Sequence, residues 1–229
     1  MLKHPLRQGA HRRGRVGIRS RNQGRTMSKQ PIDRRLLLKG AASFAVLAPL
    51  PAWAATGPTV TEIAFDPAIP ALGNPDGDVT IAEFVDYQCP ICKLVFVELK
   101  KLMEEDSGIR LVMKDWPIFG DVSRDAARVA LLTGEHYAAA VDALMTNQRG
   151  LSERCTNDIL ASVGVDVAMV RADLAIREPD IDAALLRTDT QATAFKLRGT
   201  PALVIGGSLY RRGMPVSELR QAVASARSA

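Results

Sequence analysis

The chain has 229 residues, which is room for one elaborated domain or for two small ones. Its net charge of +5 comes from one end, because residues 1–54 hold 12 of the 30 Lys and Arg residues and 1 of the 25 Asp and Glu residues. Residues 55–229 therefore carry 18 basic and 24 acidic side chains, a net charge of −6, which removes the electrostatic support for nucleic-acid binding.

The first 54 residues are predicted to be a targeting segment rather than part of the fold. Residues 1–26 hold eight Lys or Arg residues and no acidic residue, as in an unstructured basic extension or a start site assigned too early. A basic region with Arg34 and Arg35, an apolar stretch over residues 40–50 and the small-residue site "AWA", residues 52–54, then follow in the order of a cleavable signal peptide. The leader is of the twin-arginine or the Sec type.

The elements that follow alternate between strand and helix. A Pro/Gly-rich arm, residues 55–78, leads to residues 79–87, "VTIAEFVDY", which are apolar on both faces and predict a central parallel strand. Apolar residues recur at helical spacing over residues 92–103, and Gly108 ends this predicted helix. A second strand over residues 109–117 completes a βαβ unit.

The rest of the chain predicts a helical insertion and a second small unit. Residues 121–196 are helical in pattern and contain no strand candidate. Two short runs over residues 202–213 predict an antiparallel hairpin, and residues 216–227 predict a last amphipathic helix. We therefore predict an α/β fold formed by residues 55–120 and 197–229 and interrupted by the helical insertion.

The motif "CPIC" contains two of the three cysteines, Cys89 and Cys92. Pro90 suits the first turn of a helix, so Cys89 is expected at the helix N-terminus, where free N–H groups and the helix dipole favour a thiolate. Cys92 lies one turn further, against the apolar face. The spacing predicts an exposed nucleophile in Cys89 and a shielded resolving thiol in Cys92.

Other interpretations of this motif have less support. A structural zinc site needs four ligands, and only Cys155 and His136 remain in the mature chain. Inert buried thiols fit a reducing compartment better than an oxidising one, and a disulfide across so short a loop removes little unfolded-state entropy. Redox chemistry without a metal or other cofactor is therefore predicted. Cys155 is predicted to be a small core residue, with pairing between two chains as the alternative.

Two further features accompany the cysteines. Glu83 shares a strand face with Ile81 and Val85, and a buried acid there would have a raised pKa and could exchange protons with the thiols. The alternative is an edge carboxylate that reaches water. Thr200 and Pro201 open the later strand, and sequence physics alone predicts an ordinary trans bond between them.

The two motifs together, "EFVDYQCPICK" at residues 83–93 and "RGTPALVIGG" at residues 198–207, resemble the DsbA-like thioredoxin-fold thiol oxidoreductases of the bacterial periplasm. The resemblance covers residues 75–229 and implies a thioredoxin fold with an inserted all-helical subdomain, residues 121–196. It also implies exported cysteine-containing proteins, unfolded or extended, as substrates and a membrane redox partner of the DsbB type.

The resemblance assigns a role to each site residue. It implies that Cys89 is the nucleophile, Cys92 the resolving cysteine and Glu83 the buried acid. It further implies that Thr200 and a cis Pro201 form the loop beside the disulfide, where an extended substrate adds as a strand.

The direction of the reaction is a separate question. The best-known oxidase of the family has histidine where this chain has Ile91, so a less oxidising disulfide is expected. Isomerases usually carry a dimerisation domain or stalk, for which residues 55–78 are too few, so an oxidase is favoured over an isomerase or a reductase. A copper(I) carrier or a holdase is the non-enzymatic alternative, although copper carriers usually add methionine or histidine beside the cysteines.

Overall fold

The computed structural model describes residues 58–229, so the predicted basic extension and signal peptide lie outside the described residues. The centre of the fold is a five-stranded sheet with the order β1-β3-β2-β4-β5. Its central strand, β2, is parallel to β3 and antiparallel to β4, so the predicted βαβ unit and hairpin belong to one sheet. The strands are β1 (Ala71–Gly73), β2 (Val79–Val85), β3 (Ile109–Asp115), β4 (Ala202–Ile205) and β5 (Ser208–Tyr210).

The segment before β2 has more structure than the sequence predicted. The predicted arm contains a short helix, α1 (Val60–Ala64), and the edge strand β1, which pairs antiparallel with β3 through Ala71 and Val112. Thr59 and Glu62 form a capping box that begins α1. Three strand residues are too few to show a period-2 pattern, which is why β1 was missed.

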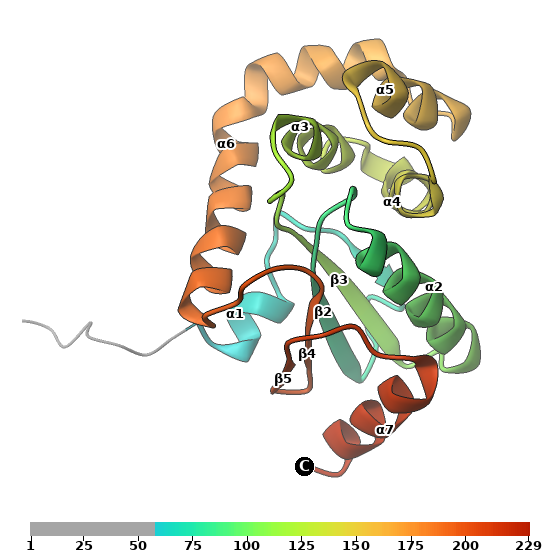
Figure 1. Ribbon diagram of the computed structural model, residues 1–229, viewed down its shortest axis with the longest axis vertical. Coiled ribbons are helices and arrows are strands. Elements are labelled where there is room, and N and C mark those ends of the chain that lie inside the picture. Colours follow the sequence, from blue (N-terminus) through green and yellow to red (C-terminus); the bar gives the residue numbers. More distant parts are fainter. Residues whose placement is uncertain (1–57) are drawn as a thin grey trace, which may run out of the picture. The chain divides into compact units, whose positions relative to one another are not determined.

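Helices cover both faces of the sheet (Figure 1). On one face, α2 (Pro90–Glu105) packs beside α7 (Val216–Arg227), and α7 also contacts β2 and β4. On the other face, α1 contacts β2, and the long helix α6 (Val167–Ala194) contacts β3. Phe84 of β2 meets Phe195 on this second face, with ring centroids 6.2 Å apart. The sheet is therefore a buried middle layer, as its apolar strands require.

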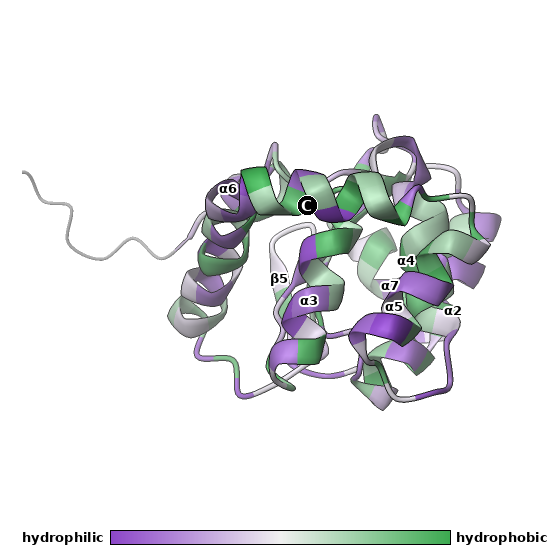
Figure 2. Cartoon of the chain, turned by 90° about the horizontal axis from the view of Figure 1, so that it is seen from above, coloured by the Kyte–Doolittle hydropathy of each residue, from purple (hydrophilic) through white to green (hydrophobic). Residues whose placement is uncertain are grey.

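The predicted helical stretch between β3 and β4 is helical in the structure. It consists of α3 (Asp121–Ala130), a short 3₁₀ helix (Gly134–His136), α4 (Tyr137–Thr146), α5 (Glu153–Ser162) and α6. Helices α3 and α5 carry both hydrophilic and hydrophobic residues in Figure 2, as amphipathic helices do. Their separation into a domain of their own, residues 121–196, stays a prediction.

Helix α6 continues through a proline in the second half of the predicted helical stretch. It has 28 residues and contains Pro179, which removes one backbone hydrogen bond and accounts for the bend visible in Figure 1. The residues around Pro179 are exposed, so water can satisfy the freed carbonyl group. No helix within residues 58–229 combines the length and the apolar character that crossing a bilayer would need.

A buried ion pair connects β3 to the elements that cover the second face of the sheet. Lys114 of β3 is fully buried, and its Nζ lies 3.2 Å from Oδ2 of Asp66, which follows α1. Arg187 of α6 donates to the same carboxylate at 3.0 Å. Burial lowers the pKa of Lys114, and the nearby Asp66 carboxylate offsets part of that shift. The pair therefore fixes α1, β3 and α6 relative to one another.

Candidate active site

Cys89 occupies the N-cap position of α2, with φ −71° and ψ 115°, and Pro90 follows at the first helical position. Its Sγ accepts a hydrogen bond from the backbone N–H of Cys92 at 3.4 Å. The same Sγ lies 3.5 Å from the carbonyl oxygen of Thr200, so the thiol donates to that oxygen. Cys89 and Cys92 are both free thiols. The helix start and the loop before β4 thus meet at one sulfur atom.

The predicted contrast in exposure between the two thiols is wrong. Cys89 is buried, with 3% of its surface exposed, and Cys92 has 0% exposed. The physical reason is the contact with Thr200, because the loop before β4 lies against the Cys89 sulfur. Only a small part of Cys89 is therefore open to an incoming thiol.

The loop reaches the helix because of the register between β2 and β4. Ala202, the first residue of β4, pairs with Phe84, so the preceding residues Thr200 and Pro201 extend past the end of β2 toward Cys89. The Thr200–Pro201 peptide bond is cis, as the family resemblance implied and unlike the ordinary trans bond suggested by sequence physics alone. Pro201 is buried, and the Thr200 hydroxyl has no hydrogen-bond partner.

Glu83 lies beneath the two thiols on the central strand. It has 0% of its surface exposed, and neither carboxylate oxygen has a hydrogen-bond partner. Burial raises the pKa of Glu83 well above its ordinary value, and the proximity of the Cys89 sulfur adds to the shift. Burial and the nearby Glu83 raise the pKa of Cys92 in turn. Since β2 is flanked by β3 and β4, the alternative of an edge carboxylate in water does not describe this residue.

Comparison with known proteins identifies the class of enzyme. A family model described as thioredoxin matches residues 66–225. The chain is 34% identical to a thioredoxin-like oxidoreductase from Silicibacter pomeroyi DSS-3, with a TM-score of 0.72 over 75% of this chain and 99% of that one. It is 27% identical to the thiol-disulfide exchange protein alpha-DsbA2 from Wolbachia pipientis, with a TM-score of 0.67 over 72% and 90% of the chains.

The chain belongs to the DsbA-like thioredoxin-fold thiol-disulfide oxidoreductases. A probable disulfide bond formation protein D from Bacillus cereus is also 29% identical over 154 residues, which are 61% of this chain and 70% of that protein. The predicted α/β thioredoxin fold is thereby confirmed, and this DsbA-like protein is an enzyme that exchanges thiols and disulfides.

Asp86 is a residue of the DsbA-like site that sequence reasoning missed. Its Oδ1 accepts hydrogen bonds from the N–H of Gln88 at 2.8 Å and the hydroxyl of Ser123 at 2.7 Å, and its Oδ2 accepts one from the N–H of Phe119 at 3.0 Å. This buried carboxylate ties the turn before Cys89 to the start of α3. The only sequence signal was its position between the strand and the "CPIC" motif.

Asp115 is a second residue that sequence reasoning missed. It pairs with Val85 at the end of β3, so its side chain is on the same sheet face as Glu83, and it has 1% of its surface exposed. Neither carboxylate oxygen has a hydrogen-bond partner, although the hydroxyls of Tyr87 and Tyr137 lie nearby. Burial raises the pKa of Asp115 to about 8, although the nearby Tyr87 hydroxyl acts to lower it. The face beside the cysteines therefore contains two buried acids whose pKa values are raised by burial.

Cys155 lies on α5 and is half-buried against the core. Its backbone N–H donates to the Ser152 hydroxyl at 3.1 Å, which caps the helix. This position agrees with the small core residue that we predict, and its lack of a redox role stays a prediction.

Replacing Glu83 by Gln should slow thiol exchange while the fold persists. The amide keeps the size of the side chain but cannot donate a proton to the Cys92 sulfur or accept one from it. The rate of thiol-disulfide exchange with a dithiol peptide should therefore fall about tenfold or more. Stopped-flow kinetics from pH 5 to 8 measures the rate, and Glu104→Gln, at an exposed site on α2, is the control. An unchanged rate across this range would remove Glu83 from the mechanism.

Asp115→Asn should stabilise the protein, and more so at higher pH. The pKa of Asp115 is about 8 in the folded state, against an ordinary value of 3.8 for the unfolded chain. The unfolded chain therefore loses this proton first, and the folded state loses stability as pH rises between the two values. Asn does not titrate, so the gain in unfolding free energy should grow from pH 5 to pH 8 by up to about 4 kcal/mol. Urea unfolding measures it, with the exposed Asp158→Asn as control. An equal gain at both pH values would mean that Asp115 ionises freely.

Proposed function

We propose that this protein is an oxidase that introduces disulfides into exported proteins through a Cys89–Cys92 disulfide. The supporting observation is the placement of the Cys89 sulfur between the Cys92 N–H at the start of α2 and the Thr200 carbonyl. A helix N-terminus stabilises negative charge on this sulfur, which makes Cys89 a good nucleophile and a good leaving group. Thr200 and Pro201 form the wall of the site.

The proposed reaction moves two electrons from the substrate to the enzyme. A substrate thiolate attacks Sγ of Cys89, the Cys89–Cys92 bond breaks, and Cys92 leaves with the electron pair. A second substrate thiolate then attacks the substrate sulfur of this mixed disulfide and releases Cys89 as a thiolate. The substrate is thereby oxidised to a disulfide, and a membrane redox partner of the DsbB type accepts the two electrons and restores the enzyme disulfide.

Glu83 has a defined task in this cycle. Because burial raises the pKa of Cys92, its departure as a bare thiolate is unfavourable. Glu83, whose own pKa is raised by burial, holds a proton next to this sulfur and donates it as the bond breaks. The proton returns to Glu83 when the disulfide forms again.

The surface around the cysteines suits an extended, unfolded substrate. The backbone of Thr200 borders the site, and an extended chain can pair with it as an added strand. On α2, Ile91 and Leu94 are 50% and 65% exposed, and together with Met214 they line a shallow apolar groove. Exposed apolar side chains in a DsbA-like enzyme provide contact with unfolded chains, which still expose their own apolar residues.

Two sequence features support this proposal: the first supports export, and the second favours an oxidase over an isomerase. The signal-peptide pattern of residues 1–54 directs the protein to the periplasm, by the twin-arginine or the Sec route, where exported chains need disulfides. Residues 55–78 are too few for the stalk or domain on which isomerases dimerise.

The two cysteines should differ in the complexes that they trap. Cys92→Ala removes the thiol that resolves a mixed disulfide on Cys89, so this variant should accumulate mixed disulfides with exported cysteine-containing proteins. Cys89→Ala should trap far fewer, because burial and the nearby Glu83 raise the pKa of the remaining thiol, Cys92, and keep it protonated. The test is to express both variants in the periplasm, quench with acid, alkylate free thiols and compare non-reducing gels.

Cys155→Ser is the control in this experiment, and adding it to Cys92→Ala should leave the trapped complexes unchanged. Equal trapping by the two active-site variants, or trapping only by Cys89→Ala, would reverse the roles assigned to the cysteines.

A further inference from the structure

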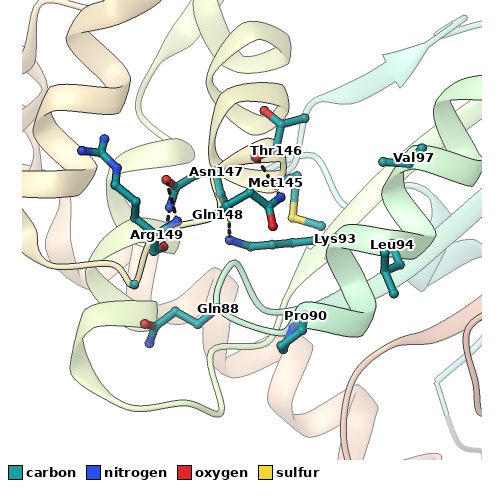
Figure 3. Close-up of a pocket in the computed structure, with 11 residues that line it drawn as sticks. Gln88, Pro90, Lys93, Leu94, Val97, Met145, Thr146, Asn147, Gln148 and Arg149 are labelled. Carbon is teal, nitrogen blue, oxygen red and sulfur yellow. Dashed lines mark hydrogen bonds between the residues drawn. The ribbon is translucent and has the colours of Figure 1, made fainter.

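A pocket of about 400 Å³ opens directly beside the nucleophile, between the first turns of α2 and the segment that joins α4 to α5 (Figure 3). Gln88 and Pro90, the two neighbours of Cys89 in the sequence, both line it. Its other walls include the apolar side chains of Leu94 and Met145. A substrate whose cysteine reaches Cys89 therefore brings its adjacent residues to this pocket.

The charged groups in the lining of this pocket are all positive. Lys93 and Arg149 are its only ionisable lining residues, and no carboxylate lines it. Figure 3 shows Lys93 extending from α2 across the pocket toward the α4–α5 segment, whereas the Arg149 side chain lies at the rim and points away from Lys93. The pocket thus combines an apolar wall with a cationic end.

Lys93 still has donors for a ligand. Its Nζ donates one hydrogen bond to the carbonyl oxygen of Asn147, which leaves two of its three N–H groups. Cys155 and Asp86 both lie close enough to act on the pKa of Lys93. The oxygens of Asp86 already accept hydrogen bonds from Gln88, Ser123 and Phe119. Burial lowers the pKa of Lys93, so an anionic ligand would compensate a partly desolvated ammonium group.

Arg149 is also available. Its backbone N–H and carbonyl oxygen bond the Asn147 side chain, which holds the segment in place, and within residues 58–229 its guanidinium group makes no hydrogen bond or ion pair. A rim arginine of this kind can turn toward an anion that enters the pocket.

We propose that this pocket is a specificity subsite that binds an acidic side chain of the substrate, close to the cysteine that forms the mixed disulfide with Cys89. Lys93 binds the carboxylate, Arg149 attracts it at the rim, and Leu94 and Met145 contact its methylene groups. In an extended chain, a residue two positions from the cysteine lies about 7 Å away and points to the same side, which suits this location. The proposal rests on the proposed role of Cys89 and names the substrate class.

The test uses blocked pentapeptides that carry a central cysteine as its mixed disulfide with thionitrobenzoate, and Glu, Gln or Lys at both end positions. Because both end residues are identical, the pocket meets the same side chain whichever way round the peptide binds. In the Cys92→Ala protein the Cys89 thiolate attacks the peptide sulfur, the bond to thionitrobenzoate breaks, and the coloured anion leaves with the electron pair. Absorbance gives the rate constant, and mass spectrometry confirms the peptide on Cys89.

The Glu peptide should react about threefold faster than the Gln peptide, and the Lys peptide about threefold slower, as expected for partly exposed charge pairs. The net charge of −6 on residues 55–229 would make the Lys peptide react fastest and the Glu peptide slowest. A faster reaction of the Glu peptide would therefore come from positive charge close to Cys89. When Lys93→Gln or Arg149→Gln is added to the Cys92→Ala protein, the rate constants for the Glu and Gln peptides should become nearly equal, so that their ratio is close to one. Arg154→Gln is the matched control, because it removes the same charge from a 92% exposed site outside the pocket and should leave the ratio unchanged.

The results separate this inference from the proposed function. If no peptide releases thionitrobenzoate, Cys89 is not the nucleophile and the proposed function fails. If all peptides react equally, or if Arg154→Gln lowers the ratio as much as Lys93→Gln, the nucleophile stands and the acidic subsite is refuted.

Discussion

The site depends on one junction, where the Cys89 sulfur meets both the Cys92 N–H and the Thr200 carbonyl. The two sides of this junction are more than 100 residues apart in the chain. They meet because β2 leads directly into α2, while the antiparallel register of β4 with β2 extends the Thr200–Pro201 loop past the end of the sheet. A change in that register would move the loop away from the sulfur. The central sheet is therefore the frame of the site, and the helix start supplies its electrostatics.

Buried ionisable side chains have partners on one sheet face and lack hydrogen-bond partners on the other. On the face of α1 and α6, the buried Lys114 is compensated by the Asp66 carboxylate, which also accepts a hydrogen bond from Arg187. On the face of the cysteines, Glu83 and Asp115 have no hydrogen-bond partner, and burial raises both pKa values. An uncompensated buried acid costs stability, and such costs are concentrated at functional sites. In the function that we propose, Glu83 serves in proton transfer. Asp115, on the same face, is expected to make stability depend on pH.

Strong periodic patterns made much of the fold predictable. The seven-residue strands, the last helix and the glycine-marked hairpin were found where predicted, because each has a clear apolar period or turn signal. The three-residue strand β1 and the continuation of α6 through Pro179 were not predicted. Contacts with the rest of the fold decide whether a short edge strand forms and whether a helix continues through an exposed proline. In the site, the positions of Glu83 and the cysteines followed from local spacing. The burial of Cys89 depends on a contact with a distant loop, which no local pattern reports.

The reduction potential of the purified protein tests the central claim most directly, because the junction at Cys89 is proposed to favour the reduced enzyme. Equilibration with glutathione buffers, followed by alkylation and mass spectrometry, gives the potential. Ile91 stands where the best-known oxidase has histidine, so we predict a value below the about −120 mV of that oxidase and above the about −270 mV of thioredoxin, near or above the glutathione couple. A potential at or below that of thioredoxin would contradict the account and make the protein a reductase.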